Sequence, residues 1–171
     1  MDYVVLVDEL DNEVGIMEKM EAHEKAVLHR AFSVFLFNKK GEMLLQRRAF
    51  TKYHSGGLWT NACCSHPRPG ESNLDAARRR TFEELGFHPE LRDAFSFTYR
   101  AEFDNGLTEH EFDHVFVGNY EGPIVPDPSE VSEVCYKSME QIRSELREQP
   151  HLYTEWFKIA FHEVEEHSSL L

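Results

Sequence analysis

The segment SNLDAARRRTFEELGF, residues 72–87, constrains the fold more than any other stretch of this 171-residue chain. Ser72 is a strong N-cap residue, and Asp75 stands at the third helical position, where a negative charge suits the helix N-terminus. Gly86 supplies a C-terminal stop. Between these ends, small or apolar residues recur at helical spacing: Leu74, Ala77, Thr81 and Leu85. The segment is therefore predicted to be a helix with one side packed against a core.

Runs typical of β-strands lie on both sides of this helix. Tyr3–Val7 and a short extended stretch after the DELDN turn come first, and RAFSVFLF (30–37) and EMLLQRR (42–48) follow as a hairpin around NKKG. Later, AFSFTYRAEF and EHEFDHVFVGNY alternate and join at DNG, which predicts a second hairpin. Two more helices are expected, at about 139–148 and 152–167. We therefore expect an α+β fold of the α/β/α type, a mixed sheet flanked by helices. It forms one domain over residues 1–171, with the C-terminal helices, about 139–167, packed on it or capping it.

The overall charge limits the partners of the chain. A formal net charge of −13 argues against a nucleic-acid binder or a protein of anionic membranes, because both need a basic surface. Any phosphate site must then be a local basic pocket. The opening MDYVVLVDELDNEVG resembles neither a signal peptide nor a membrane span, and three cysteines, two of them adjacent, do not make a disulfide framework. A cytoplasmic protein with reduced thiols is expected.

The region from Ser65 to Phe87 resembles the Nudix box, GX5EX7REUXEEXGU with U apolar. Six positions match at the expected spacing: Glu71, Arg79, Glu83, Glu84, Gly86 and Phe87. Ser65 replaces the first Gly, and Arg80 replaces the Glu of the REU triplet. In hydrolases of that superfamily this Glu helps to hold the metal that activates water. The resemblance therefore implies the Nudix fold, while Arg80 argues against hydrolysis.

Several residues have side chains that suit a divalent metal. Imidazole and carboxylate ligands are available from five of them: His23, His29, His66, Glu109 and Glu111. Residues i and i+2 of a strand share one face, so Glu109 and Glu111 can point into one site while His110 faces the other way. Spacing alone does not establish that the five converge.

Longer stretches are similar to the type 1 isopentenyl-diphosphate Δ-isomerases, Nudix-superfamily enzymes that are not hydrolases. The matching stretches are LHRAFSVFLFN, LLQRRAFTK, GLWTNACCSHPRPGES, RRTFEELG, YRAEFDNGLTEHEFDHVF and, more loosely, YTEWF. They run from about Lys19 to Trp156, and the TNxCCSHP stretch and the ExE pair are specific to that family. The resemblance implies interconversion of isopentenyl and dimethylallyl diphosphate through a tertiary carbocation, in isoprenoid precursor biosynthesis.

The resemblance also implies roles for individual residues. Cys64 and Glu111 would be the two catalytic groups, on opposite sides of the substrate. The metal site would be filled by Mn2+, Mg2+ or Zn2+, and its ligands would be His23, His29, His66, Glu109 and Glu111. Glu84 would help to hold a second Mg2+ on the diphosphate. Four positive residues would surround the diphosphate: Lys19, Arg48, Lys52 and Arg80. Tyr99 and Trp156 would line the hydrocarbon end. The partner is then a small-molecule diphosphate, with no nucleic acid or membrane, and the chain is expected to be a monomer or weak dimer.

The proposed chemistry places physical demands on these residues. A carbocation must be kept from water, so acid and base must stand on fixed, opposing faces of a dry site. A Cys64 thiolate near His66 and a metal is expected near neutral pH. Which of Cys64 and Glu111 protonates the alkene is left open. Trp156 has two interpretations, a cation–π partner of the carbocation or a core residue of a helix.

Adjacent residues of an extended segment point to opposite faces, so Cys63 is expected to be buried packing beside Cys64. Two other functions compete with the isomerase. The first is a Nudix hydrolase acting on nucleoside diphosphate derivatives, against which Arg80 counts. The second is a non-enzymatic zinc module that uses Cys63, Cys64 and His66, although CCxH is not a usual structural zinc spacing.

Overall fold

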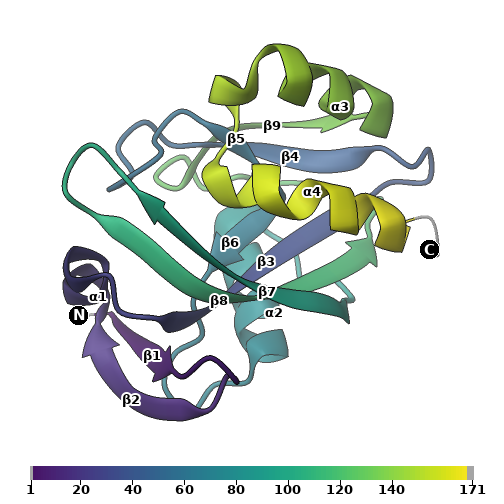
Figure 1. Cartoon of the computed structure of the whole chain (residues 1–171). Helices are drawn as coiled ribbons and strands as arrows, with labels where there is room; N and C mark the ends of the chain where they lie inside the picture. The colour runs from purple at the N-terminus through teal and green to yellow at the C-terminus, as the bar shows by residue number, and fades with distance from the viewer. Residues whose placement is uncertain (1, 169–171) are drawn as a thin grey trace.

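The computed structural model describes residues 2–168 and shows one twisted mixed sheet with helices on both faces (Figure 1). Its ends, Met1 and residues 169–171 of the predicted 1–171 domain, lie outside the described residues. In chain order the elements are β1 (Tyr3–Val7), β2 (Glu13–Glu18), α1 (Lys19–Lys25), β3 (His29–Phe37), β4 (Met43–Arg48), β5 (Trp59–Thr60), β6 (Cys63–Ser65), α2 (Asn73–Leu85), β7 (Arg92–Glu102), β8 (Thr108–Asn119), β9 (Val131–Lys137), α3 (Met139–Glu148), a 3-10 turn (Pro150–Leu152) and α4 (Glu155–Ser168). The α+β prediction is confirmed.

Strand β3 is the centre of the sheet, and its pairing differs from the hairpin predicted with β4. Only Phe37 and Met43 are in register between β3 and β4, next to the turn. Strand β8 instead runs parallel to β3, from His29 opposite Glu111 to Phe37 opposite Asn119. Strand β4 is paired along its length with β9. These partners are remote in sequence, so local turn chemistry could not reveal them.

The alternation of β3 builds a core on each face of the sheet. Phe32, Val34 and Leu36 pack toward α2, whereas Phe35 and Phe37 pack toward α3 and α4. In Figure 1, α4 crosses one side of β3 and α2 lies on the other. None of the described helices has both the length and the apolar character needed to cross a bilayer.

Helix α2 forms as its capping residues predict. The Ser72 side chain accepts a hydrogen bond from the Asp75 backbone N–H, and Gly86 closes the helix at φ 85°. One member of the predicted buried stripe is wrong: Leu74 remains 41% exposed, whereas Ala77, Thr81 and Leu85 are buried. Leu74 lies in the first turn, beyond the edge of the core that the rest of the stripe contacts. The second predicted hairpin is confirmed as β7 and β8.

Candidate active site

The adjacent cysteines of β6 point to opposite faces of the sheet. Cys63 is fully buried in the core beneath α2, as the strand alternation predicts. Cys64 is opposite Ser33 in the β3–β6 register and lies on the α4 side. Its Sγ is 3.2 Å from Asn61 Oδ1 and 2.9 Å from Trp156 Nε1, which donates to it. Trp156 is thus buried like a core residue and is also in contact with the candidate catalytic thiol.

The environment of Cys64 keeps its thiol protonated. Burial raises the pKa of Cys64 to about 12, and the charge of nearby Asp113 acts in the same direction. That a Cys64 thiolate can exist beside His66 and a bound metal stays a prediction. Hydrogen bonds with Ser33 and Asn61 lower the pKa of Cys64 but do not outweigh burial, and His66 is not among the partners of Sγ.

Strand β8 brings a row of carboxylates to the same buried region. Glu109, Glu111 and Asp113 alternate along one face of the strand, and each is buried. The Tyr99 hydroxyl, on neighbouring β7, is 2.5 Å from Glu111 Oε1 and 3.1 Å from Glu109 Oε2. His110 points away and contacts the Ala26 carbonyl oxygen. The i, i+2 spacing therefore does place Glu109 and Glu111 together.

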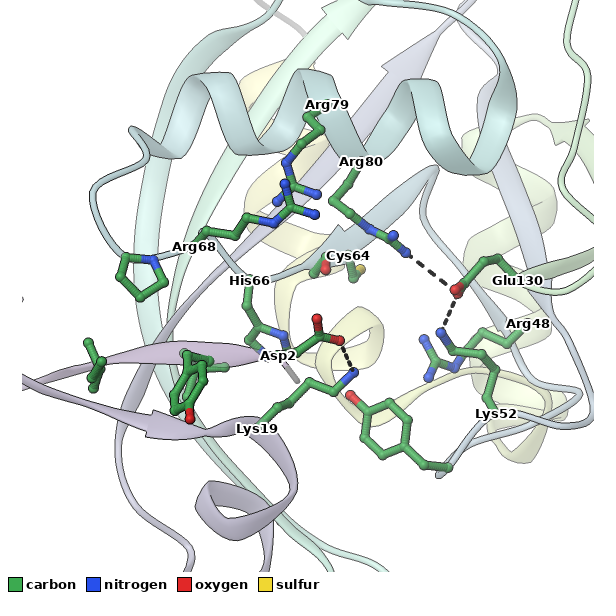
Figure 2. Close-up of a pocket in the computed structure, with 16 residues that line it drawn as sticks. Asp2, Lys19, Arg48, Lys52, Cys64, His66, Arg68, Arg79, Arg80 and Glu130 are labelled. Atoms are coloured by element: carbon green, nitrogen blue, oxygen red, sulfur yellow. Dashed lines mark hydrogen bonds and ion pairs between the residues drawn. The ribbon is translucent and has the colours of Figure 1, made fainter.

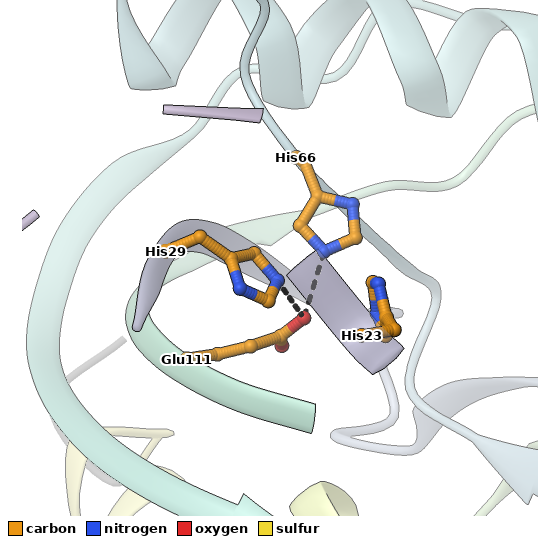
Figure 3. A group of neighbouring side chains, drawn as sticks. All are labelled: His23, His29, His66 and Glu111. Carbon is orange, nitrogen blue, oxygen red and sulfur yellow. Dashed lines mark hydrogen bonds and ion pairs between the residues drawn. The ribbon is translucent and has the colours of Figure 1, made fainter. Parts of the chain in front are cut away.

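Three histidines from separate segments surround Glu111 (Figure 3). His23 comes from α1, His29 from the start of β3 and His66 from the end of β6. The His66 and His29 Nε2 atoms are 2.7 Å and 3.1 Å from Glu111 Oε2. One ligand atom from each of the four residues lies within 4.8 Å of the others. The Nδ1 atoms of His23 and His29 contact backbone carbonyl oxygens, which orients Nε2 toward the site.

Burial favours the neutral form of two of these imidazoles, those of His23 and His66. Burial lowers the pKa of His23, and it lowers the pKa of His66 to about 4. Burial raises the pKa of Glu111, but the nearby His66 and His29 outweigh it and hold this pKa well below its usual range. Burial and the charge of Glu111 raise the pKa of Glu109. Neutral imidazole nitrogens and carboxylate oxygens are the donors that divalent metals take, so these residues fit such an ion.

A further histidine, which the sequence analysis missed, stands beside this group. His54 forms a second compact cluster with His23 and Glu109, again with ligand atoms within 4.8 Å. Burial lowers the pKa of His54 to about 2, so it is a neutral imidazole. His54 lies in the irregular segment TKYHSGG, where no strand or helix periodicity predicts the direction of a side chain. Its only local signal is a histidine among the basic residues of the loop.

A cavity of about 340 Å³ opens next to Cys64 and His66, and six of the sixteen residues that line it are lysines or arginines (Figure 2). The four residues that the resemblance assigned to the diphosphate all line it: Lys19, Arg48, Lys52 and Arg80. Arg68 and Arg79 line it as well and were not predicted. Carboxylates partly neutralise these cations. Glu130 Oε2 is 2.5 Å from Lys52 Nζ and 3.5 Å from an Arg80 nitrogen, and Asp2 pairs with Lys19.

The remaining predicted residues divide between two places. Tyr99, Trp156, Glu109 and Glu111 line a smaller buried pocket that shares Arg48, Cys64 and His66 with the cation-lined cavity. Glu84 lies apart, with one oxygen accepting from Gln46 and the other from Arg80. Among the described residues, neither metal-suited group contains a cysteine or Glu84.

Comparison with known proteins identifies the class first. Residues 27–157 match the NUDIX domain family, and solved structures with this fold superimpose closely. A crystal structure from Deinococcus radiodurans gives a TM-score of 0.72 at 19% identity, covering 86% of this chain and 90% of that one. A MutT protein from Methanosarcina mazei gives 0.68 at 21% identity, covering 82% and 94%. These structures establish the fold alone. The chain belongs to the Nudix family.

Sequence relatives define the branch within that class. Isopentenyl-diphosphate Delta-isomerase 2 of Aromatoleum aromaticum is 52% identical over 91% of this chain and 82% of the relative. The Pectobacterium atrosepticum isopentenyl-diphosphate Delta-isomerase is 50% identical over 92% and 88%. A Photorhabdus laumondii isopentenyl-diphosphate Delta-isomerase 2 is 44% identical over 99% of both chains. With them, this chain belongs to the isopentenyl-diphosphate Delta-isomerase family.

Proposed function

We propose that this protein is an isomerase that interconverts isopentenyl diphosphate and dimethylallyl diphosphate in isoprenoid precursor biosynthesis. The observation that carries the proposal is the shared wall of the two cavities. Cys64 borders both the cation-lined cavity and the buried pocket that holds Glu111 and Tyr99. A diphosphate among the cations would therefore leave its five-carbon tail next to two proton-transfer groups. The family membership gives the same activity independently.

The surroundings of the buried pocket suit a carbocation. The reaction adds a proton to one carbon of the alkene and removes one from another, through a tertiary carbocation that water would trap. Trp156 and Tyr99 close the pocket with aromatic surface, and both are buried. The Arg48 guanidinium already lies 5.3 Å from the centre of the Trp156 ring, so this indole accepts a cation nearby. The buried aromatic walls thus support the cation–π interpretation of Trp156.

Cys64 and Glu111 hold complementary protonation states in the structure. The Cys64 Sγ keeps its proton at neutral pH, and Glu111 is ionised. One group can therefore donate a proton while the other accepts one, and the roles exchange when the reaction runs in reverse. Tyr99, within 2.5 Å of Glu111 Oε1, can hold the carboxylate in place and deliver a proton to it. Asn61 and Trp156 fix the position of Sγ from two sides.

We infer that the His/Glu group is the metal site. Mn2+, Mg2+ or Zn2+ would be held by five residues: His23, His29, His66, Glu109 and Glu111. A bound cation supplies positive charge that stabilises the Glu111 carboxylate. His23 Nε2 and Glu109 Oε1 are buried without a hydrogen-bond partner, which supports the fit. Because Gln46 and Arg80 occupy both oxygens of Glu84, a Mg2+ there would need oxygens of the diphosphate itself as further ligands.

The cation-lined cavity supports a diphosphate substrate rather than its hydrolysis. Lys19, Arg48, Lys52 and Arg80 would bind the phosphate oxygens with charge-assisted hydrogen bonds. Arg80 occupies the helix position at which Nudix hydrolases carry a metal-binding Glu, and it points into this cavity (Figure 2). A residue that binds the substrate phosphate thus replaces one that would help to activate water.

The test is the isomerisation of isopentenyl diphosphate by the purified protein with Mg2+, compared with three variants. Cys64→Ala and Glu111→Gln should each reduce kcat by about 10³-fold or more, because each removes a proton-transfer group. Cys135→Ser, which changes a half-buried thiol on β9 outside the site, should retain the wild-type rate. Folded, metal-loaded wild-type protein that forms no dimethylallyl isomer would contradict the proposal. A screen of nucleoside diphosphate derivatives for phosphate release would then test the hydrolase.

The domain, the compartment and the oligomeric state of the protein can also be proposed. We propose that residues 1–171 act as one isomerase domain, with α3 and α4 covering the face of the sheet on which Cys64 lies. The three cysteines are free, which suits a reducing compartment such as the cytoplasm. A monomer or weak dimer remains our expectation, to be measured by light scattering.

A further inference from the structure

Three buried polar atoms without hydrogen-bond partners converge on one point beside the proposed metal site. They are His23 Nε2, His54 Nε2 and Glu109 Oε1. All three belong to one cluster whose ligand atoms lie within 4.8 Å of one another. A buried polar atom without a partner costs free energy, so such atoms are uncommon, and three together call for a ligand. Each of them carries a lone pair suited to a metal ion.

The geometry between His54 and Glu109 supports a shared cation. His54 Nε2 is 2.9 Å from Glu109 Oε1, close enough for a hydrogen bond, yet neither atom has one. The lone pairs are thus directed past each other rather than along a common N–H···O line. Two potential ligand atoms that lie this close without a hydrogen bond between them are arranged like neighbouring ligands of one ion. His54 Nδ1 contacts Ser55 Oγ at 3.1 Å, which leaves Nε2 for the site.

The chain holds His54 in this position from several sides. Asn105, in the β7–β8 turn, donates to the Tyr53 carbonyl oxygen at 2.7 Å, and Arg48 donates to the His54 carbonyl oxygen at 3.2 Å. The imidazole stacks on Phe103 with ring centroids 4.4 Å apart and planes 8° from parallel. Its side chain is only 2% exposed. A ligand fixed by both backbone and ring contacts is preorganised to bind a metal.

The two metal-suited clusters cannot hold separate ions through His23. They share His23, whose Nδ1 contacts the Lys19 carbonyl oxygen at 2.7 Å, so only Nε2 is available to a metal. A single imidazole nitrogen does not bridge two cations. We propose that His54 is a direct ligand of the metal centre and completes a set of four imidazole nitrogens and two carboxylate groups around one ion: His23, His29, His54, His66, Glu109 and Glu111. This inference rests on the metal site of the proposed function.

A set of six protein ligands has two chemical consequences. Four imidazoles favour a first-row transition ion or zinc over Mg2+, which prefers oxygen ligands and retains water. The centre should therefore keep such an ion in a large excess of Mg2+. Six protein ligands also leave no position open, unlike the open site of a catalytic zinc enzyme. The ion would then hold the Glu111 carboxylate in place and stabilise its negative charge without contacting the substrate.

The experiment measures Mn2+ binding directly, by competition with a chromophoric chelator, on the full chain. His54→Ala should raise the dissociation constant by at least about 100-fold, beyond the loss typical of outer-shell partners. His151→Ala, an exposed histidine of the 3-10 turn, should bind Mn2+ like wild type. His54→Gln preserves more of the side-chain volume and should lose affinity as well. Circular dichroism of the metal-free variants verifies folding, and the Gln variant serves if the Ala variant does not fold.

A crystal structure of the Mn2+-loaded protein distinguishes a ligand from a hydrogen-bond partner of Glu109. We expect His54 Nε2 at about 2.2 Å from the anomalous peak, near the usual metal–imidazole distance. A separation beyond about 3 Å, or wild-type affinity in both His54 variants, would overturn the inference. Wild-type protein that binds no Mn2+ would overturn the inference and the proposed metal site together. The isomerisation assay decides the proposed function separately.

Discussion

The His/Glu cluster and the cation-lined cavity adjoin each other but satisfy their polar groups in different ways. In the cluster, three imidazoles and a carboxylate are packed away from water, and atoms such as His23 Nε2 and Glu109 Oε1 have no partner. In the cavity, Glu130 contacts both Lys52 and Arg80, and its side chain is 26% exposed, while Arg48 Nε and Arg80 Nε have no hydrogen-bond partner. The cluster thus brings buried lone pairs together, whereas the cavity holds a partly exposed carboxylate against two of its cations.

This difference indicates what each region does during turnover. A site whose buried ligand atoms have no hydrogen-bond partner binds its ion as part of the folded structure, because unpaired buried polar atoms reduce the stability of the fold. A site whose cations are compensated by a partly exposed carboxylate can exchange that carboxylate for a phosphate, and it can release the product again. We therefore expect the ion to stay bound in the cluster during turnover, whereas the cavity binds the diphosphate substrate and releases the product.

The largest effect that sharpens this comparison concerns Cys64, which faces both regions. Because burial raises its pKa to about 12, its thiolate fraction at pH 8 is low in the metal-depleted protein. Alkylation by iodoacetamide at pH 8 should be about 10³-fold slower than for a free thiol, and its rate should continue to rise as the pH increases toward 12. Mass spectrometry of the Cys64 peptide measures this rate. A rate that levels off near pH 8 would contradict the raised pKa.

The second effect is the contribution of the metal to stability. At a free ion concentration of about 100 times the dissociation constant, binding to the native state adds about 2.7 kcal/mol. For a chain of this size, removal of the ion by a chelator should lower Tm by about 5–10 °C. Calorimetry with and without EDTA measures the difference. An unchanged Tm would mean that the buried polar atoms of the cluster are stable without a bound ion.

The smallest effect tests the exchangeable cavity. Lys52→Met removes one charged donor, and a charge-assisted hydrogen bond contributes about 1.5–3 kcal/mol. We therefore expect KM for the diphosphate to rise about 10- to 100-fold with little change in kcat. Lys40→Met, on the exposed turn between β3 and β4, is the matched control and should leave KM unchanged. A fall in kcat with constant KM would place Lys52 in the chemical step instead.

The local elements of the fold could be predicted because their signals are local. The caps of α2, the alternation of β8 and the opposite orientation of Cys63 and Cys64 follow from a few neighbouring residues. The parallel pairing of β3 with β8 was not predictable in this way. It joins residues such as His29 and Glu111 across most of the domain, and nothing near either residue specifies the other.

The site shows the same division. Glu109 and Glu111 were expected to share a face because strand geometry fixes it, whereas His54 lies on a loop whose path depends on tertiary contacts with Asn105 and Phe103. Arg68 and Arg79 line the cavity beside the predicted cations, although the sequence analysis assigned neither of them to the diphosphate. The raised pKa of Cys64 could not be read from the sequence, because burial and the charge of Asp113, both set by the fold, cause it.

The contact between Trp156 and Cys64 spans 92 residues of the chain, and its consequence appears when the protein is made. During synthesis the segment with Cys64 leaves the ribosome long before α4 does. At about 5–20 residues per second, several seconds separate the two. Throughout that interval the thiol lacks its tryptophan cover and stays reachable by oxidants. The Cys64 thiol of the nascent chain is therefore first covered when α4 has been synthesised and has packed in place.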